Sequence, residues 1–500
     1  MSSPLGITPD PALRKGLQTR HISMIALGGA IGTGLFVASG KTISDAGPGG
    51  ALAAYALMGV MVFFLMQSLG EMSAYMPCSN PFEEYGTRFV SRSFGFAAGW
   101  NYWFNWSITL AAEVVAAGLI MKFWLPDVPS WIWSLIFMVG LLALNLFAVK
   151  AFGEAEFWFA SIKVIAVVVF LIVGVLMVLG VIGGTSPGFS NWTIGDAPFV
   201  DWPLGMLSVF LIAGFAFQGT EMIAVAAGEA MEPRSAIPKA VRTVFFRILL
   251  FYIGTLTIIG FLIPYTNPEL LNGSEDNVAV APFTLVFKLA GIDAAASIMN
   301  AVILIAILSA GNASLYAATR ALYGLGVEGN APKIFGKVSK SGVPAAAVAA
   351  TVAIGALCFI ASKVGDGTAY TVLVTASSVA GFITWIGIAW AHYRFRRAWN
   401  VQGRSLDELP YRAWLYPAGP VVALLMCVGV IAGQYYVSLR AGEEGGWELL
   451  LTSYAALILF VGLWVGHKLV TKAPTVDLRT ADLSPSAAAS AHRDPDPASA

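Results

Sequence analysis

Twelve apolar stretches, each of about 20 residues or more, occupy most of this 500-residue chain. A helix needs roughly 20 consecutive apolar residues to cross the hydrocarbon core of a bilayer. Charged residues make up only 12% of the sequence, whereas about 25% is usual for a soluble domain. We therefore expect an all-α polytopic membrane protein with 12 transmembrane helices. The stretches cover residues 22–46, 50–76, 95–125, 130–149, 156–183, 203–228, 244–264, 283–326, 345–363, 369–392, 413–438 and 448–470.

Lysine and arginine are unevenly distributed between the loops that join these stretches. The side that contains the amino terminus holds most of the 29 Lys and Arg residues, whereas loops 184–202 and 265–282 on the other side hold none. Because cytoplasmic loops carry an excess of Lys and Arg, both termini are predicted to be cytoplasmic and the number of spans to be even. We interpret residues 1–21 as an amino-terminal tail, 22–470 as one twelve-helix domain and 471–500 as a disordered tail.

Glycines interrupt two of the apolar stretches. The first contains GGAIGTGLF (residues 28–36), with four glycines within seven residues, and each glycine costs roughly 1 kcal/mol relative to alanine inside a helix. The sixth contains LIAGFAFQGTEMIAVAAGE, in which Gly214 and Gly219 bracket the midpoint. A membrane helix can be interrupted only where the released backbone lines a cavity or is buried in protein. We therefore expect helices 1 and 6 to be broken.

The two interrupted stretches are five spans apart, so the units that contain them have opposite orientations in the membrane. This pattern indicates an inverted repeat of five plus five helices, over residues 22–183 and 203–392, with two further helices in 413–470. Close helix packing is an alternative use of the glycines. A phosphate-binding loop is excluded, because no Lys-Ser/Thr follows the glycines and no strand precedes them.

Broken helices expose backbone groups that would otherwise be paired. The N–H groups at the start of a half-helix bind a carboxylate, and the carbonyls at the end of the opposite half-helix bind an ammonium or another cation. The backbone of a free amino acid carries both charges. The two breaks are therefore compatible with a binding site for an amino acid near the middle of the membrane.

Several ionisable residues lie inside apolar stretches, where a charge costs about 2.5–3.5 kcal/mol on insertion scales and is usually functional. Lys163, in FASIKVIAVVVF, either exchanges a proton during a working cycle or forms a permanent ion pair. Glu221 follows the second break and either faces its cavity or caps a helix end. Glu229 lies nearer to the cytoplasmic end, where a solvated position is the alternative. Glu113 either pairs with another helix or approaches a substrate.

Aromatic residues cluster in GWNYWFNW (residues 99–106). Tyr102 and Trp106 are one helical turn apart and share a face of the expected third helix. If this face meets the two breaks, both side chains line a pocket that Phe215, beside Gly214, closes. Packing against lipid or neighbouring helices is the alternative.

Residue patterns typical of enzymes and metal sites are not found in this sequence. The four histidines and three cysteines are isolated and flank or lie within apolar stretches, so we expect no metal site and no disulfide framework. There is no recognisable nucleophile–base pair and no phosphate loop. We therefore predict that the protein is not an enzyme, has no cofactor and does not bind nucleic acid.

Five sequence blocks resemble the amino-acid permeases of the amino acid–polyamine–organocation (APC) superfamily, in the same order. The most specific is AGPGGALAAYALMGVMVFFLMQSLGEMSAYMP (residues 46–77). The other four are GGAIGTGLF, FGEAEFWFASIKV, GFAFQGTEMIAVAAGEAMEPRSAIPKAV and LSAGNASLYAATRALYGLGVEGNAPKIF. The resemblance covers roughly residues 12–470 and implies a leucine-transporter-like fold.

The resemblance also implies roles for individual residues. The substrate carboxylate would meet the backbone from Ile31 to Gly34, and its amino group would meet carbonyls near Ala26 and around Phe215. Lys163 matches the lysine that couples transport to protons in proton-driven members. The substrate-binding positions implied in this way are Ala26, Ile31, Gly32, Thr33, Gly34, Tyr102, Trp106, Phe215, Glu221 and Glu229.

Within the family, the likeness is to members that carry lysine. It implies proton-coupled import of L-lysine across a bacterial inner membrane by alternating access, with the proton, the amino acid and the lipid bilayer as partners. Glu113 stands where the lysine-carrying relative has Asp, and the external segment NGSEDNV also differs. An amino-acid exchanger, an aromatic or neutral amino-acid permease, and a sensor that binds without transporting are the alternatives.

Overall fold

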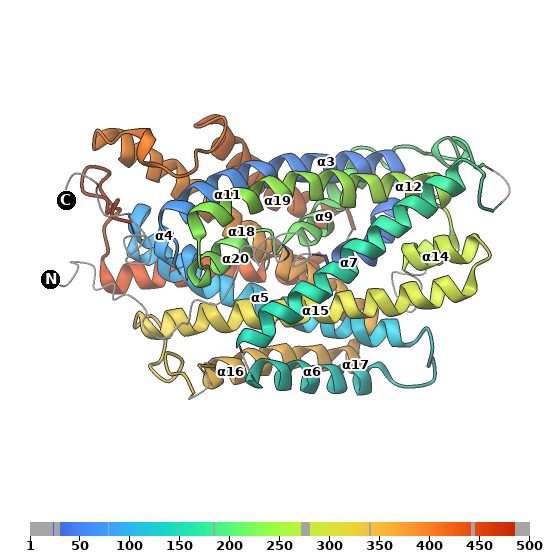
Figure 1. Ribbon diagram of the computed structural model, residues 1–500, viewed down its shortest axis with the longest axis horizontal. Helices are drawn as coiled ribbons and strands as arrows, with labels where there is room; N and C mark the ends of the chain where they lie inside the picture. The colour runs from blue at the N-terminus through green and yellow to red at the C-terminus, as the bar shows by residue number, and fades with distance from the viewer. Residues whose placement is uncertain are drawn as a thin grey trace, which may run out of the picture.

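The computed structural model describes Met24 and residues 31–78, 80–147, 149–183, 186–271, 281–339, 342–441 and 446–485. In these ranges every regular element is a helix (Figure 1). Ten helices there are long and apolar enough to cross a membrane, and a shorter apolar helix adds to them. The all-helical class is thus confirmed for the described part of the chain, and the ten long apolar helices are candidate membrane spans.

Between residues 31 and 178, the described part of the chain forms six α-helices. A corner lies inside α3, because Gly47 has φ 72° and ψ 168° and Pro48 follows it. A positive φ suits glycine, and proline is favoured at the start of the next helix. The first two expected stretches therefore meet at this corner. The helices are α2 (Thr33–Phe36), α3 (Ala38–Tyr75), α4 (Pro81–Phe89), α5 (Arg92–Met121), α6 (Ser130–Phe147) and α7 (Val149–Val178).

The second half begins with shorter helices and continues with long ones. A π-helical segment, Ile248–Gly254, joins α11 to α12, and a 3-10 segment, Ala356–Ile360, joins α16 to α17. The helices are α8 (Leu204–Ser208), α9 (Phe210–Phe217), α10 (Met222–Ala226), α11 (Pro233–Arg247), α12 (Thr255–Leu262), α13 (Pro268–Leu271), α14 (Pro282–Leu289), α15 (Asp293–Val327), α16 (Ala345–Gly355), α17 (Ala361–Val364), α18 (Asp366–Val401), α19 (Ala418–Ala441) and α20 (Gly446–Thr471).

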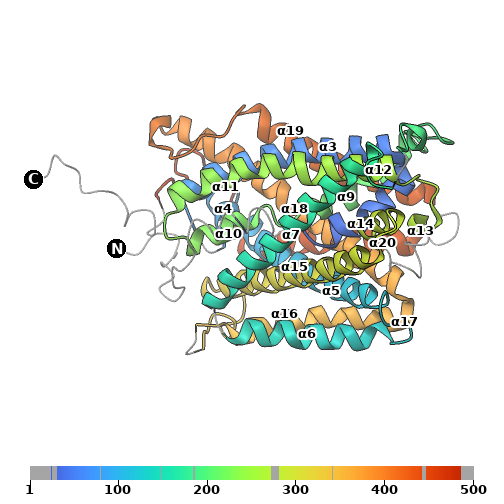
Figure 2. The same ribbon diagram turned by 45° about the vertical axis from the view of Figure 1, so that its right-hand side comes forward.

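Helix α5 lies at the centre and packs against α15, α18, α4 and α20. Figures 1 and 2 both show α6 and α16 side by side along one edge, and α3, α11 and α12 along the opposite edge. Exposed apolar side chains lie on the peripheral helices, for example Val139 on α6, Ile165 on α7 and Leu425 on α19. Such surfaces suit contact with lipid rather than water.

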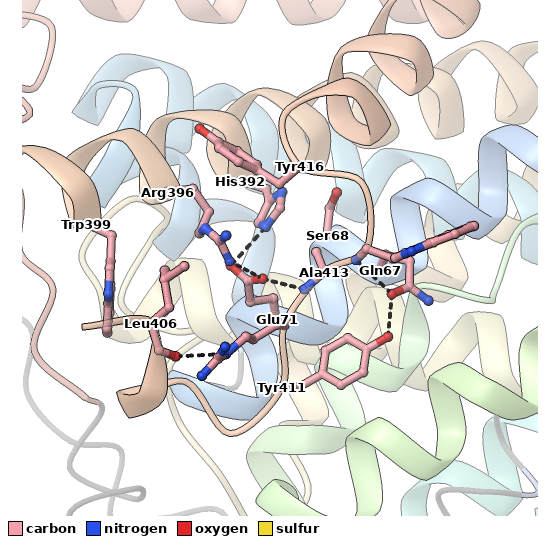
Figure 3. Close-up of polar contacts among 12 residues, drawn as sticks. Gln67, Ser68, Glu71, His392, Arg396, Trp399, Leu406, Tyr411, Ala413 and Tyr416 are labelled. Atoms are coloured by element: carbon pink, nitrogen blue, oxygen red, sulfur yellow. Dashed lines mark hydrogen bonds and ion pairs between the residues drawn. The ribbon is translucent and has the colours of Figure 1, made fainter. Parts of the chain in front are cut away.

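A buried ion-paired cluster joins α3 to α18. The Glu71 carboxylate accepts hydrogen bonds from the Arg396 guanidinium at 2.8 Å and from the Ala413 backbone N–H at 2.5 Å. The His392 Nε2 lies 3.2 Å from the same carboxylate. Figure 3 shows all three groups directed at Glu71. The Glu71 and His392 side chains are 0% exposed, so each depends on its neighbours to offset desolvation.

The segment between α18 and α19 is held against α3 beside this cluster. The Gln67 Oε1 accepts hydrogen bonds from the Tyr411 hydroxyl at 2.5 Å and from the Trp414 backbone N–H at 3.3 Å (Figure 3). Together with the Ala413 contact, these bonds fix residues 411–414 to one face of α3.

Residues 472–485, which we call the strap, follow α20 and pack against the ends of α3 and α4. The Tyr75 hydroxyl donates to the Leu483 carbonyl at 3.1 Å, and Arg88 donates to the Ser484 carbonyl at 3.1 Å. Gln402, after α18, donates to the carbonyls of Leu478 and Ala481. This arrangement differs from the disordered tail expected over 471–500, because backbone carbonyls of the strap satisfy buried side-chain donors. Residues 486–500 lie outside the described part.

Replacing Glu71 with Gln leaves the Arg396 guanidinium and the His392 ring buried without their carboxylate. Breaking one partner of a buried ion pair costs about 3–5 kcal/mol. The midpoint of thermal unfolding in detergent is therefore expected to fall by several degrees. Glu232→Gln is the matched control, because Glu232 is exposed. Equal midpoints for the two variants would contradict the stabilising role of Glu71.

Candidate functional site

The first glycine-rich segment reaches α2 through residues that are not helical. Ile31 and Gly32 precede the helix, and Gly32 has φ −138° and ψ −145°. Its carbonyl accepts from the N–H groups of Leu35 at 3.3 Å and Phe36 at 3.2 Å. The first N–H groups of a helix have no acceptor within that helix. The start of α2 therefore offers backbone donors inside the protein.

Gly32 and Gly34 allow α2 to approach its neighbours closely. A Cβ at Gly32 would lie 2.7 Å from the Glu113 Oε1 and 2.8 Å from the Ala310 Cβ. At Gly34 a Cβ would lie 2.5 Å from the Ala216 Cα of α9. These separations are too short for any side chain, so both positions require glycine.

The second glycine-rich segment separates α9, which ends at Phe217, from α10, which begins at Met222. Between them Gly219 has φ 89°, a value that favours glycine. Both carboxylate oxygens of Glu221 accept from the Gly219 N–H at 3.2 Å, and Oε2 also accepts from the Trp385 indole at 3.3 Å. Glu221 thus stabilises the non-helical backbone from within it.

A small cavity lies between the two non-helical segments. Its volume is about 20 Å³, room for about one water molecule. Glu113 forms part of its wall: Oε1 accepts from the Thr33 hydroxyl at 3.1 Å, while Oε2 has no hydrogen-bond partner among the described residues. The lining residues are Gly32, Gly34, Trp106, Thr109, Glu113, Phe215, Gln218, Ala310 and Ser314.

Hydrogen bonds between α5 and α18 support one side of the cavity. The Thr109 hydroxyl lies 2.7 Å from the Ser377 hydroxyl, which donates to the side-chain amide oxygen (Oδ1) of Asn105 at 2.9 Å. The Gln218 amide donates to the Ser377 backbone carbonyl at 3.1 Å. Gln218 therefore links the second non-helical segment to α18, and Ser377 in turn bonds to α5.

Four lining residues were not predicted from the sequence: Thr109, Gln218, Ala310 and Ser314. Gln218 had a usable signal, since it is the amide between Gly214 and Gly219 in the interrupted stretch. Thr109 lies one turn beyond Trp106 on the same helix. Ala310 and Ser314 are small residues of α15 whose contact with α2 depends on tertiary packing.

Lys163 is fully buried on α7. It interacts electrostatically with Glu156 of the same helix and with Glu113 of α5. The Ser309 hydroxyl of α15 lies 3.0 and 3.1 Å from the two Glu156 oxygens. Lys163 is therefore coupled electrostatically to Glu113, which forms part of the cavity wall.

Of the remaining residues predicted for the site, some line the cavity, one does not, and the side chains of two lie outside the described part. Tyr102 does not line it and packs on Phe82, with ring centroids 4.2 Å apart, and on Trp106, with centroids 6.1 Å apart. Ala26 lies outside the described residues, and so does the side chain of Glu229. Trp106 and Phe215 are wall residues.

A second cavity, of about 70 Å³, lies beside the junction between α2 and α3. Val37 and Lys41 line it, together with Glu269 and Tyr370. Under the orientation predicted from the loops, this cavity faces the outside. Among the described residues, no group of three or more His, Cys, Asp or Glu could hold a metal ion.

Comparison with known proteins gives consistent matches. A family model described as amino acid permease matches residues 21–479. The chain is 52% identical over 471 residues to the lysine-specific permease LysP of Escherichia coli (strain K12), covering 94% of this chain and 96% of that protein. It is 48% identical over 483 residues to LysP of Lactococcus lactis, covering 95% and 94% of the two chains. It is also 49% identical over 475 residues to the histidine permease HisP of L. lactis, covering 94% and 98%.

The family match extends over both non-helical segments and all the described cavity residues. The several apolar helices long enough to span a membrane fit a multi-pass protein. Permeases move a substrate across a membrane without changing it chemically. The chain therefore belongs to the amino acid permease family, and it is a multi-pass membrane transporter rather than an enzyme.

Proposed function

We propose that this protein imports L-lysine together with a proton by alternating access across a bacterial inner membrane. The observation that carries the proposal is the cavity whose wall combines Gly32 and Gly34 of one non-helical segment with Phe215 and Gln218 of the other. The proposal also includes a topology of twelve membrane helices in an inverted repeat, with helices 1 and 6 broken and both termini in the cytoplasm.

In this proposal the substrate carboxylate binds the backbone N–H groups at the start of α2, where the partial positive charge of a helix end favours an anion. The α-amino group binds carbonyls at the end of α9, near Phe215. Gly32 supports this arrangement, because a side chain there would collide with Glu113 and Ala310. Ala26 and Glu229 remain predicted contacts.

The preference for lysine has two supports. The two relatives named LysP are 52% and 48% identical to this chain. In addition, Glu113 lines the cavity, and its Oε2 has no hydrogen-bond partner among the described residues. This carboxylate, which also interacts electrostatically with Lys163, can offset the desolvation of a cationic group in the cavity. The histidine permease relative, at 49% identity, makes histidine the second candidate substrate.

The cavity must widen during transport, because its volume of about 20 Å³ is too small for an amino acid. Trp106, Phe215 and Gln218 are the largest uncharged side chains of its wall, so we expect widening to involve them. Rocking of one group of helices against another would open the cavity to each side in turn. Proton and substrate are coupled if each changes the affinity for the other.

Replacing Lys163 with Ala removes the proposed proton carrier. We expect accumulation of labelled lysine driven by an inward proton gradient to fall at least tenfold in proteoliposomes. Exchange of internal for external lysine, which needs no net proton movement, is expected to persist. Gradient-driven uptake by this variant at the wild-type level would rule out the coupling role.

Replacing Gly32 with Val forces a branched side chain against Glu113 and Ala310, which a Cβ would already approach within 2.8 Å. We expect lysine binding, measured by scintillation proximity in detergent, to weaken at least tenfold. Gly462→Val on α20 is the control, since a Cβ there meets nothing within 4 Å. Wild-type affinity in the Gly32 variant would mean that this segment does not bind the substrate.

The function itself is tested by uptake of labelled lysine into proteoliposomes with an inward proton gradient. We expect accumulation that collapses with a protonophore and is inhibited more strongly by unlabelled lysine than by arginine, histidine, phenylalanine or GABA. Strong inhibition by histidine or phenylalanine would assign a different substrate. Binding without driven uptake would favour an exchanger or a sensor.

A further inference from the structure

Glu156 is a buried carboxylate with no role in the function proposed so far. It is 1% exposed and lies seven residues before Lys163 on α7, which is close to two helical turns. Both side chains therefore lie on the same face of the helix. A charged carboxylate inside a membrane-spanning segment is costly, so we expect Glu156 to have a cationic partner nearby.

Two interactions fix the Glu156 carboxylate. The Ser309 hydroxyl of α15 lies within hydrogen-bond distance of both oxygens, at 3.0 and 3.1 Å, and Lys163 interacts with it electrostatically. Ser309 precedes Ala310, which lines the cavity. The carboxylate is thus anchored on the helix that forms the cavity wall, but does not itself line the cavity.

The charged groups around Lys163 come from three helices. Glu156 lies on α7, Glu113 on α5 and Arg247 at the end of α11. Arg247 repels the Lys163 ammonium, but its guanidinium donates to the Tyr252 hydroxyl at 2.7 Å and interacts electrostatically with Glu221. Among the described residues, the two carboxylates are therefore the groups that attract the ammonium.

The two carboxylates differ in what else they contact. Glu113 accepts from Thr33, beside the proposed substrate site, and lines the cavity. A substrate ammonium in the cavity would compete with Lys163 for it. Glu156 does not line the cavity, and its hydrogen bond to Ser309 lies outside the cavity wall. It is the carboxylate that can hold the lysine charge throughout a transport cycle.

We propose that Glu156 is a positioning residue that holds the coupling proton on Lys163, and so sets the external pH at which import operates. This inference rests on the proposed function. The proton binds the Lys163 amine to form an ammonium, and Glu156 stabilises that charged form without taking the proton. Removing the Glu156 charge weakens proton binding, so a more acidic medium is needed to load the carrier.

The test is the pH profile of gradient-driven lysine uptake in proteoliposomes for Glu156→Gln. Removing a nearby opposite charge is expected to lower the external pH of half-maximal uptake by about one unit. Uptake at the most acidic pH should stay within about threefold of wild type, and Glu156→Asp, which keeps the charge, should restore much of the shift. Glu232→Gln, at an exposed position, is the control.

The outcomes separate this inference from the proposed function. Wild-type protein without gradient-driven uptake would refute the proposed function itself. Driven wild-type uptake, with a Glu156→Gln profile that keeps its midpoint and falls equally at every pH, would refute the positioning role alone. If that variant does not fold, Ser309→Ala replaces it: a smaller acidic shift in the midpoint is expected, and an unshifted midpoint overturns the proposal.

Discussion

The interior of a bilayer supplies no water to pair with backbone N–H and C=O groups, so each interruption of a helix must be satisfied by the protein itself. The two non-helical segments meet this requirement in different ways. Gly32 uses its carbonyl for the first turn of α2, whereas the Gly219 N–H is taken up by the carboxylate of Glu221. The backbone that remains available lies at the start of α2, next to Glu113.

The membrane class and the positions of both glycine-rich segments could be predicted from the sequence, because hydropathy and glycine spacing are local properties. The sequence could not decide whether Glu221 faces the cavity or caps a helix end. Its carboxylate accepts from a backbone N–H two residues away and from the indole of Trp385, 164 residues further along. The wall residues Ala310 and Ser314 and the Ser309–Glu156 contact likewise depend on how α15 packs against α2 and α7. Ala26 and the Glu229 side chain stay predictions.

Buried charges connect helices that the proposed transport cycle moves. Glu113, Lys163 and Glu156 lie on α5 and α7, and hydrogen bonds link the two carboxylates to Thr33 of α2 and Ser309 of α15. A change in charge at any one of them alters the electrostatic energy of contacts between four helices. Linkage of this kind is what lets the binding of one ligand change the affinity for another. The Glu71 cluster, by contrast, joins α3 and α18 through residues that line neither of the two cavities described above.

The strap bears on how the polypeptide is assembled during synthesis. Its carbonyls accept from Tyr75, Arg88 and Gln402, which belong to segments translated well before it. Those donors remain without these acceptors until the ribosome has made residues 478–484. The strap can therefore cover the surface that these donors form only after α20, which directly precedes it in the chain, has been synthesised.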